Sequence, residues 1–159
     1  MAARVTKILF VCHGNICRSP MAEFVMKHLV AQQGCEAEFH IESAATSSEE
    51  LGNEVYPPAR RMLAQHGIAC AGKRARRLRA DDYANFDWLI GMDEENMWNM
   101  RRLYAGDPSG KIRMLLDFTG THREVADPWY TGNFQDTWDD VLAGCTALLE
   151  FLRKNENKE

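Results

Sequence analysis

The chain has 159 residues, of which 26% are charged and 45% hydrophobic, and its formal net charge is −4. This length fits one domain, because single domains usually contain roughly 100 to 200 residues. The balanced composition excludes a disordered chain and a coiled rod. The mildly acidic total argues weakly against a general nucleic-acid binder, which usually shows a strong basic bias.

Short apolar runs alternate with amphipathic segments along the chain. In order, the sequence predicts a strand over 5–11, a helix that begins at Ser19-Pro20 and ends at Gly34, a strand over 39–45, a helix between Pro57 and Gly67, a strand over 86–92, a helix capped by Asp93, a strand over 112–116 and a helix over 138–152. This alternation predicts an α/β fold. We expect one three-layer domain over 1–159, with a four-stranded parallel sheet and helices on both faces. Residues 154–159 are polar and are expected to form a frayed tail.

Five cysteines are an odd number in a chain with no recognisable secretory signal. The apolar run 8–11 is too short for a signal-peptide core, and no stretch approaches the roughly 20 apolar residues of a membrane span. We therefore expect a cytoplasmic protein without membrane contact, whose cysteines are thiols. No cysteine or histidine spacing matches a zinc site, so no metal is predicted.

The turn after the first predicted strand carries the strongest chemical signal: Cys12-His13-Gly14-Asn15-Ile16-Cys17-Arg18-Ser19-Pro20. In open parallel sheets, ligands bind beyond the carboxyl ends of the strands, where this turn lies. Gly14 permits a positive φ and Asn15 tolerates one, so the turn can point several N–H groups inward. The helix start and Arg18 attract phosphate to the same point. We expect Cys12 to be a thiolate nucleophile beside a phosphate cradle.

The simplest alternative is that Cys12 is a buried structural thiol. It leaves unexplained why a thiol, a glycine turn, an arginine, a serine and a helix start coincide at one strand end. The turn is not a nucleotide-binding loop, because no lysine follows a second glycine, and it implies no Mg²⁺ site.

Residues 11–23 resemble the active-site signature of the low-molecular-weight protein tyrosine phosphatases. Further matches are Ser43-Ala44-Ala45-Thr46, His66-Gly67-Ile68, Ala75-Arg76, Met92-Asp93 with Asn96, and Asp127-Pro128. The resemblance implies a flavodoxin-like arrangement and a metal-independent phosphatase without cofactor. Such an enzyme would hydrolyse phosphotyrosine in proteins, and small aryl phosphates, through a phosphocysteine. Its partners would be tyrosine-phosphorylated proteins, and we expect a monomer.

The resemblance also implies roles for individual residues. Cys12 would attack phosphorus, and water would then hydrolyse the phosphocysteine. Arg18 and the N–H groups of the turn would hold the equatorial oxygens. Ser19 would hydrogen-bond the thiolate, and Asn15 would hold the turn in place, with Ser43 as one candidate partner.

Two Asp-Pro pairs are candidates for the acid that protonates the leaving group. Asp107-Pro108 precedes Ser-Gly and predicts a plain turn. The resemblance selects Asp127, which would donate to the ester oxygen and then act as a base toward water. A turn aspartate without a catalytic role is the alternative for Asp127.

On the substrate side, His13 and Gly14 are expected to line the site, and family analogy points Ile16 into it. The branch that acts on phosphoarginine tends to carry threonine there, so isoleucine favours an aryl substrate. Trp129 and Tyr130 are expected at the mouth of the pocket, with ordinary packing as the alternative.

Several positions depart from the family pattern. Lys73 stands where the family often has histidine, and Ala45 stands in place of the usual glycine. Glu49 and Glu50 would form an acidic wall that disfavours acidic peptides. The basic patch 73–79 is interpreted mainly as a solvated face, with attraction of anionic partners as the alternative.

The resemblance implies a reversible Cys12–Cys17 disulfide under peroxide, which would protect Cys12 from irreversible oxidation. A packed thiol is the alternative for Cys17. Cys145 lies in an apolar helical stripe and is expected in the core. No role is assigned to Cys35 or Cys70.

Three other functions stay open. A thiol-dependent arsenate reductase shares this fold and loop but needs further cysteines, and residues 86–127 contain none. A phosphocysteine carrier would not need Asp127. A non-catalytic phosphoprotein-binding or redox-sensing module would not need Cys12, Arg18 and Asp127 together.

Overall fold

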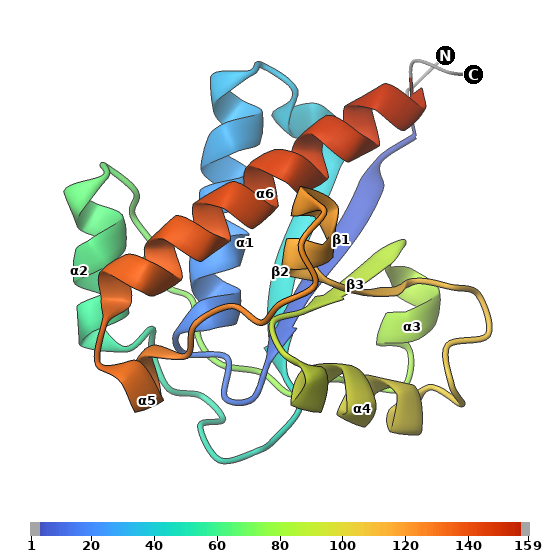
Figure 1. The fold of residues 1–159 in the computed structure, drawn as a ribbon, viewed down its shortest axis with the longest axis horizontal. Coiled ribbons are helices and arrows are strands. Elements are labelled where there is room, and N and C mark those ends of the chain that lie inside the picture. The colour runs from blue at the N-terminus through green and yellow to red at the C-terminus, as the bar shows by residue number, and fades with distance from the viewer. Residues whose placement is uncertain (1–3, 157–159) are drawn as a thin grey trace.

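A computed structural model describes residues 4–156 and places a four-stranded parallel sheet at the centre of the molecule (Figure 1). The strands are β1 Thr6–Cys12, β2 Phe39–Ala45, β3 Trp88–Gly91 and β4 Ile112–Met114. The α-helices are α1 Arg18–Gln32, α2 Pro57–Gln65, α3 Asp82–Asn85, α4 Glu94–Leu103, α5 Pro128–Thr131 and α6 Phe134–Glu156. Two 3-10 helices, η1 Glu36–Glu38 and η2 Leu115–Thr119, complete the described chain.

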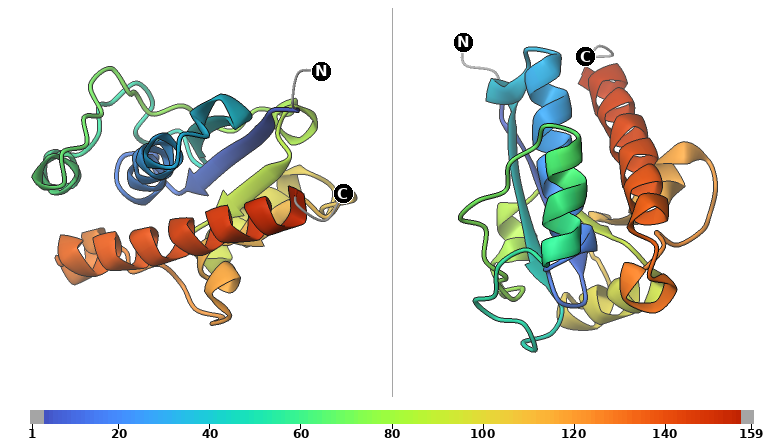
Figure 2. Two further views of the ribbon diagram at one scale, coloured as in Figure 1. Left: turned by 90° about the horizontal axis from the view of Figure 1, so that it is seen from above. Right: turned by 90° about the vertical axis from the view of Figure 1, so that its left-hand side faces the viewer.

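Two separate hydrophobic clusters cover the two faces of the sheet, and β1 contributes side chains to both clusters. Ile8 and Phe10 belong to the cluster that includes buried residues of α1, α2 and α6, whereas Leu9 and Val11 belong to the cluster that includes α4. Successive side chains of a strand point to opposite faces, so this alternation builds three layers. Figure 2 shows α6 and α3 on opposite sides of the sheet. The predicted three-layer α/β fold is confirmed.

The strand order β2-β1-β3-β4 places the loop after β1 at a reversal of the sheet topology. The chain leaves β1 for β2 on one side, whereas β3 lies on the other side, so the order reverses at β1. Ligands of open α/β sheets bind at such a reversal, beyond the carboxyl ends of the strands. In Figure 1 this edge is the lower end of the sheet, where the segments before α1, α4 and α5 meet.

Several predicted boundaries were wrong. Strand β3 is shorter than 86–92, and β4 stops at Met114 because the chain turns into η2, whose Leu115 is buried against α6. Helix α1 begins at Arg18 with Cys17 as N-cap, so Ser19 lies inside the first turn instead of capping it. Helix α6 begins at Phe134 instead of 138 and continues to Glu156, so the first half of the predicted tail is helical, and 157–159 lie outside the described residues.

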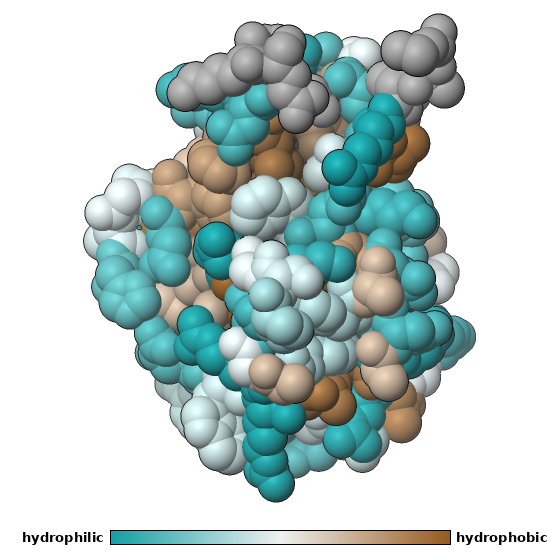
Figure 3. All heavy atoms as spheres, turned by 90° about the vertical axis from the view of Figure 1, so that its right-hand side faces the viewer, coloured by the Kyte–Doolittle hydropathy of each residue, from teal (hydrophilic) through white to brown (hydrophobic). Residues whose placement is uncertain are grey.

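The predicted helices otherwise agree with the structure, and α4 has the capping residue expected for it. The Asp93 side chain accepts a hydrogen bond from the Asn96 N–H, and Asn96 returns one to the Asp93 N–H. Within 4–156, no helix is long and apolar enough to cross a membrane. The face formed by α3, the end of α4 and the loop that follows is mainly hydrophilic (Figure 3).

Candidate active site

The backbone of the loop between β1 and α1 is held by one residue in the left-handed region. Asn15 has φ of 59°, which asparagine adopts more readily than most side chains. Gly14 does not have a positive φ, contrary to one expectation from the sequence. Glycine is suited to this position because Glu50 packs closely against it: a Cβ on residue 14 would lie 3.3 Å from Glu50 Cγ. The lack of a side chain at Gly14 therefore lets the following loop close over the turn.

The Asn15 side chain connects the loop to two neighbouring segments. Its Nδ2 donates to Ser19 Oγ at 2.8 Å and to Ser43 Oγ at 2.9 Å, and its Oδ1 accepts from the Arg76 N–H at 3.1 Å. Only 1% of Asn15 is exposed, so these bonds form away from water. Asn15 thus fixes the loop against β2 and against the segment at Arg76. The hydrogen bond to Ser43 that the sequence analysis named as a candidate is present.

The Cys12 thiol lies at the centre of this network. Its Sγ is 3.0 Å from Ser19 Oγ and accepts from the Asn15 N–H at 3.3 Å. Because Ser19 Oγ already accepts from Asn15, its own proton is free to point at the sulfur. We refer to the buried residues of this network as the floor: Cys12, Asn15, Arg18, Ser19 and Ser43.

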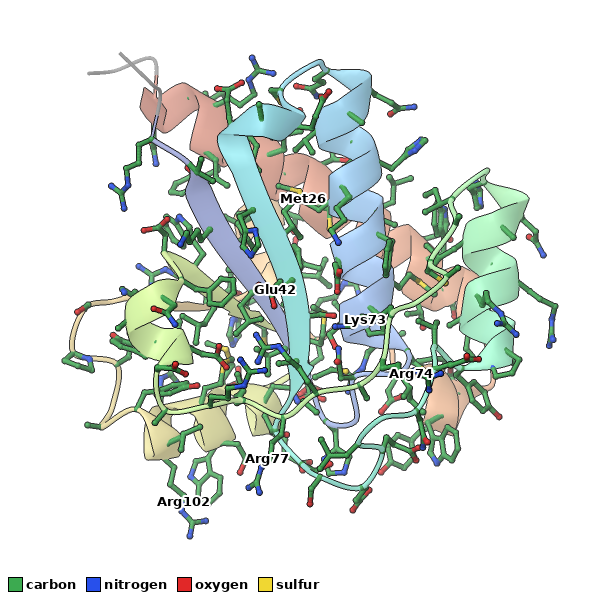
Figure 4. All side chains as sticks on the ribbon, turned by 180° about the vertical axis from the view of Figure 1, so that it is seen from behind. Met26, Glu42, Lys73, Arg74, Arg77 and Arg102 are labelled. Atoms are coloured by element: carbon green, nitrogen blue, oxygen red, sulfur yellow. The ribbon has the colours of Figure 1, made fainter. Side chains whose placement is uncertain are left out.

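A buried ion pair supports the floor from behind. Ser43 Oγ donates to Glu23 Oε1, and Lys73 Nζ donates to the Ser43 carbonyl at 2.9 Å and lies 3.3 Å from Glu23 Oε1. Figure 4 shows Lys73 on the segment that crosses α1 and β2. Burial lowers the pKa of Lys73, while the Glu23 carboxylate opposes that shift. Lys73 therefore belongs to this support and not to a solvated face.

Two other residues of the basic patch 73–79 also make internal contacts. Arg74 donates to the Gly52 carbonyl and Arg76 lies 3.0 Å from Asp82. Arg77 lies at the end of β2 and points outward (Figure 4). Arg74, Arg77 and Arg79 are exposed, so the expected solvated face is confirmed for these three residues, whereas Lys73 and Arg76 are partly buried in internal contacts.

Arg18 is fixed by three groups despite being the residue expected to grip an anion. Its Nη2 is 2.8 Å from Asp93 Oδ2 and 3.4 Å from Asp127 Oδ2, and its Nη1 donates to the Val125 carbonyl at 3.2 Å. Its side chain is 4% exposed. Burial alone would lower the pKa of Arg18, but the negative charges of Cys12, Asp93 and Asp127 raise it. The guanidinium is therefore held charged and in place.

Sequence reasoning made no prediction for Glu95 and missed the contact between Arg18 and Asp93. Asp93 was predicted only as a helix cap, and it caps α4 with one oxygen while the other pairs with Arg18. A signal was available, because Asp93 follows a predicted strand and so lies at the ligand-binding edge of the sheet. The structure thereby places an acidic residue between Arg18 and α4.

Asp127, the second carboxylate beside Arg18, stands at the start of α5. Its Oδ1 accepts from the Trp129 N–H at 3.0 Å, so it is the N-cap of this short helix. Trp129 packs edge-to-face against Tyr56 with ring centroids 5.3 Å apart, whereas Tyr130 is 87% exposed. Asp107, the other Asp-Pro candidate, accepts from the Tyr83 hydroxyl and stabilises a turn, as predicted.

A cavity of about 360 Å³ opens above the floor. Both Cys12 and Asp127 line it, and so does every residue predicted on the substrate side. Glu49, Glu50 and Glu95 line it as well. We refer to its outward-facing residues as the rim: His13, Glu49, Glu50, Glu95, Trp129 and Tyr130. Asn15, Ser19 and Ser43 lie behind the cavity lining, where they contact the other floor residues.

The second cysteine of the loop also lines this cavity. Burial raises the pKa of Cys17 to about 12, and the negative charges of Cys12 and Asp127 add to the effect. All five cysteines are buried, and Cys145 is fully buried in the core as predicted. Among residues 4–156, no group of three or more histidine, cysteine or acidic side chains forms a metal site.

The fold and the site together define an α/β protein that carries a buried thiol and a fixed guanidinium in the loop between β1 and α1. The family model described as low molecular weight phosphotyrosine protein phosphatase matches residues 7–158. The low molecular weight protein-tyrosine-phosphatase YfkJ of Bacillus subtilis is 36% identical over 151 residues, which cover 94% of this chain and 97% of that protein. The chain therefore belongs to the low molecular weight phosphotyrosine protein phosphatase family.

Solved structures agree with this assignment. The crystal structure of YfkJ from Bacillus subtilis matches with a TM-score of 0.93 at 34% identity and covers 98% of this chain and 99% of that chain. The crystal structure of DARP, a Drosophila arginine phosphatase, matches with a TM-score of 0.85 at 29% identity, covering 92% of this chain and 98% of that one. The shared architecture thus includes a protein named for a different phosphoryl substrate.

Proposed function

We propose that this chain hydrolyses phosphotyrosine in proteins, and small aryl phosphates, without a metal and through a phosphocysteine at Cys12. One observation carries the proposal: a buried thiol, a fixed guanidinium and a carboxylate converge on one cavity from Cys12, Arg18 and Asp127. Family membership makes the phosphatase chemistry the expected use of this arrangement.

In the first step, the Cys12 sulfur attacks phosphorus and the bond to the phenolic oxygen breaks. Asp127 supplies the proton that the departing phenolate takes up. In the second step, water attacks the phosphocysteine, Asp127 accepts a proton from that water, and the thiolate leaves with inorganic phosphate as product. Ser19 stabilises the thiolate in both steps, since its hydroxyl lies 3.0 Å from Cys12 Sγ.

Arg18 and the N–H groups of the loop stabilise the charge on the equatorial oxygens of the phosphoryl group. Asp93 holds Arg18 in the orientation for this task, so it acts as a positioning residue. Asn15 and Ser43 maintain the shape of the loop through their shared hydrogen bond.

The proposed substrate is aryl because Ile16 lines the cavity and, together with Trp129, presents an apolar surface to a phenyl ring. Phosphoarginine is the second candidate, and the likeness to an arginine phosphatase favours testing it. A threonine at position 16 would favour phosphoarginine, and this chain has isoleucine.

The proposal also covers the cellular compartment, the oligomeric state and the redox regulation of the protein. We place the protein in the cytoplasm as a monomer acting on tyrosine-phosphorylated proteins. Peroxide would convert the Cys12 thiolate to a sulfenic acid, and Cys17 would displace water from it to form a disulfide. The location of both thiols at one cavity supports this step. Intact mass after mild peroxide tests it: a Cys12–Cys17 bond is expected, and sulfonic acid at Cys12 without that bond contradicts it.

The decisive experiment is hydrolysis of para-nitrophenyl phosphate in the presence of a metal chelator. We expect turnover that the chelator does not change, whereas a phosphocysteine carrier, a binding module and an arsenate reductase all predict little or none. Initial rates on matched phosphotyrosine and phosphoarginine peptides then decide the substrate. A preference for phosphoarginine would overturn the aryl assignment and leave the phosphocysteine chemistry intact.

A further inference from the structure

The cavity is far more acidic than a phosphate-binding pocket needs to be. Five carboxylates line it, from Glu49, Glu50, Asp93, Glu95 and Asp127. Among the described residues that line it, the basic side chains are one arginine and one histidine. An adjoining hollow adds Glu124 and no further basic side chain. A phosphorylated substrate carries about two negative charges of its own, so this surplus calls for a compensating group.

Four of the five carboxylates fall into two sets with different partners. Asp93 and Asp127 both pair with Arg18, at 2.8 and 3.4 Å, and belong to the phosphate end of the cavity. Glu49 and Glu95 stand on the rim with side chains 70% and 71% exposed. Their charges therefore act on the parts of a substrate that flank its phosphate group, and not on the phosphate group itself.

His13 lies between these two rim carboxylates. Its Nε2 is 3.0 Å from Glu49 Oε2, and its Nδ1 is 4.0 Å from Glu95 Oε1. The two glutamates come from the loop after β2 and from the first turn of α4, so they approach the mouth from opposite walls. A single imidazole, itself 47% exposed, is thus the basic group that both walls share.

We propose that the rim selects phosphotyrosyl sites flanked by lysine or arginine. This preference rests on the proposed function of the cavity and names the class of substrate that it takes. A basic side chain beside the phosphotyrosine meets Glu49 or Glu95 within a Debye length, which is about 8 Å at physiological salt. An acidic side chain at the same place meets like charges, and the phosphate it accompanies is repelled at the mouth.

The test uses two phosphotyrosyl peptides of equal length that differ only in the residues next to the phosphotyrosine, lysine in one and glutamate in the other. One exposed charge pair changes an equilibrium by roughly two- to fivefold, so attraction in one peptide and repulsion in the other give a kcat/KM ratio of about ten or more at low salt. Raising the salt to about 0.5 M should bring the ratio close to one.

Matched variants assign the preference to the rim. Replacing both glutamates in E49Q/E95Q should reduce the ratio several-fold. Glu36→Gln removes one exposed carboxylate at the amino end of β2, on the edge of the sheet away from the cavity, and should leave the ratio as in the wild type. Para-nitrophenyl phosphate, which has no flanking residues, reports whether each variant is still an active enzyme.

The outcomes separate two kinds of failure. Turnover of both peptides with a ratio near one at low salt would overturn the proposed selectivity and leave the phosphatase intact. A large ratio that E49Q/E95Q does not reduce would also overturn it, because the preference would then arise elsewhere. Absence of turnover with para-nitrophenyl phosphate as well as with both peptides would contradict the proposed function itself.

Discussion

The floor and the rim of the cavity are built by opposite rules. Floor residues are at most 4% exposed, and each polar side chain has a protein partner within hydrogen-bonding distance. Rim residues face solvent, and Tyr130 is almost fully exposed. A buried and fully bonded group keeps its position whatever ligand arrives, whereas an exposed side chain changes its rotamer at little cost. The floor is therefore suited to chemistry that every substrate shares, and the rim to features that distinguish substrates.

The largest effect is expected from Cys12→Ser in the floor. A serine hydroxyl is a far weaker nucleophile than a thiolate, so kcat should fall by roughly 10⁴-fold or more. Because Ser19, Asn15 and Arg18 remain in place, phosphate should still raise the melting temperature of the variant. Cys70→Ser, a buried thiol outside the cavity lining, is the matched control. Substantial turnover by Cys12→Ser would contradict the phosphocysteine mechanism.

Asp127→Asn tests the carboxylate that joins floor and rim. Loss of a general acid typically costs about 10²- to 10⁴-fold, and the cost should be largest for phosphate esters with poor leaving groups. The measurement is kcat for a series of substituted phenyl phosphates, and kcat of the variant should depend more steeply on the pKa of the phenol than kcat of the wild type. An equal loss for good and poor leaving groups would remove Asp127 from the acid role.

Asp107→Asn is the matched control, because it alters the other Asp-Pro pair. Against the cost of burial, hydrogen bonds from Tyr83 and from the Lys111 and Ile112 N–H groups hold the pKa of Asp107 below its ordinary value. The stability that Asp107 contributes is therefore present at neutral pH and lost as the pH falls through the acid range. The control should melt at a lower temperature near pH 7 without any change in leaving-group dependence.

The same contrast explains how much the sequence predicted. The floor was predictable because four of its five residues lie within residues 12–19, where spacing alone brings them together. The acidic rim was only half predictable, because Glu49 and Glu95 are far apart in the sequence and the strand order brings both of them to His13. Asp93 shows the limit most clearly: its capping role followed from local pattern, but its contact with Arg18 depends on how β1 and β3 pair.

Asn15 allows the geometry of the floor to be weakened without touching a reacting group. Asn15→Gly accepts the positive φ but loses the side-chain bonds to Ser19, Ser43 and the Arg76 N–H. The buried partners left behind should lower the free energy of unfolding by about 1–3 kcal/mol. We expect kcat to fall more than KM rises, because a loosened loop holds the transition state less well.

Asn15→Ala separates backbone strain from lost hydrogen bonds, since alanine loses the same bonds and also disfavours φ of 59°. Urea unfolding should place Asn15→Ala about 1–2 kcal/mol below Asn15→Gly. Equal stabilities for the two variants would show that the backbone of the loop relaxes when the side chain is removed.

The smallest effect is expected at the rim, from Tyr130→Ala. Tyr130 has no side-chain partner among the described residues and is 87% exposed, so stability should change by less than about 0.5 kcal/mol. Its ring can contact a peptide only in the bound state, and we expect KM to rise a fewfold with little change in kcat. Trp129→Ala is the comparison, because Trp129 packs against Tyr56 and its removal should also lower the melting temperature. If Tyr130→Ala instead lowered kcat and the melting temperature as a floor variant does, the division between a rigid floor and an adaptable rim would fail at the residue where it is most pronounced.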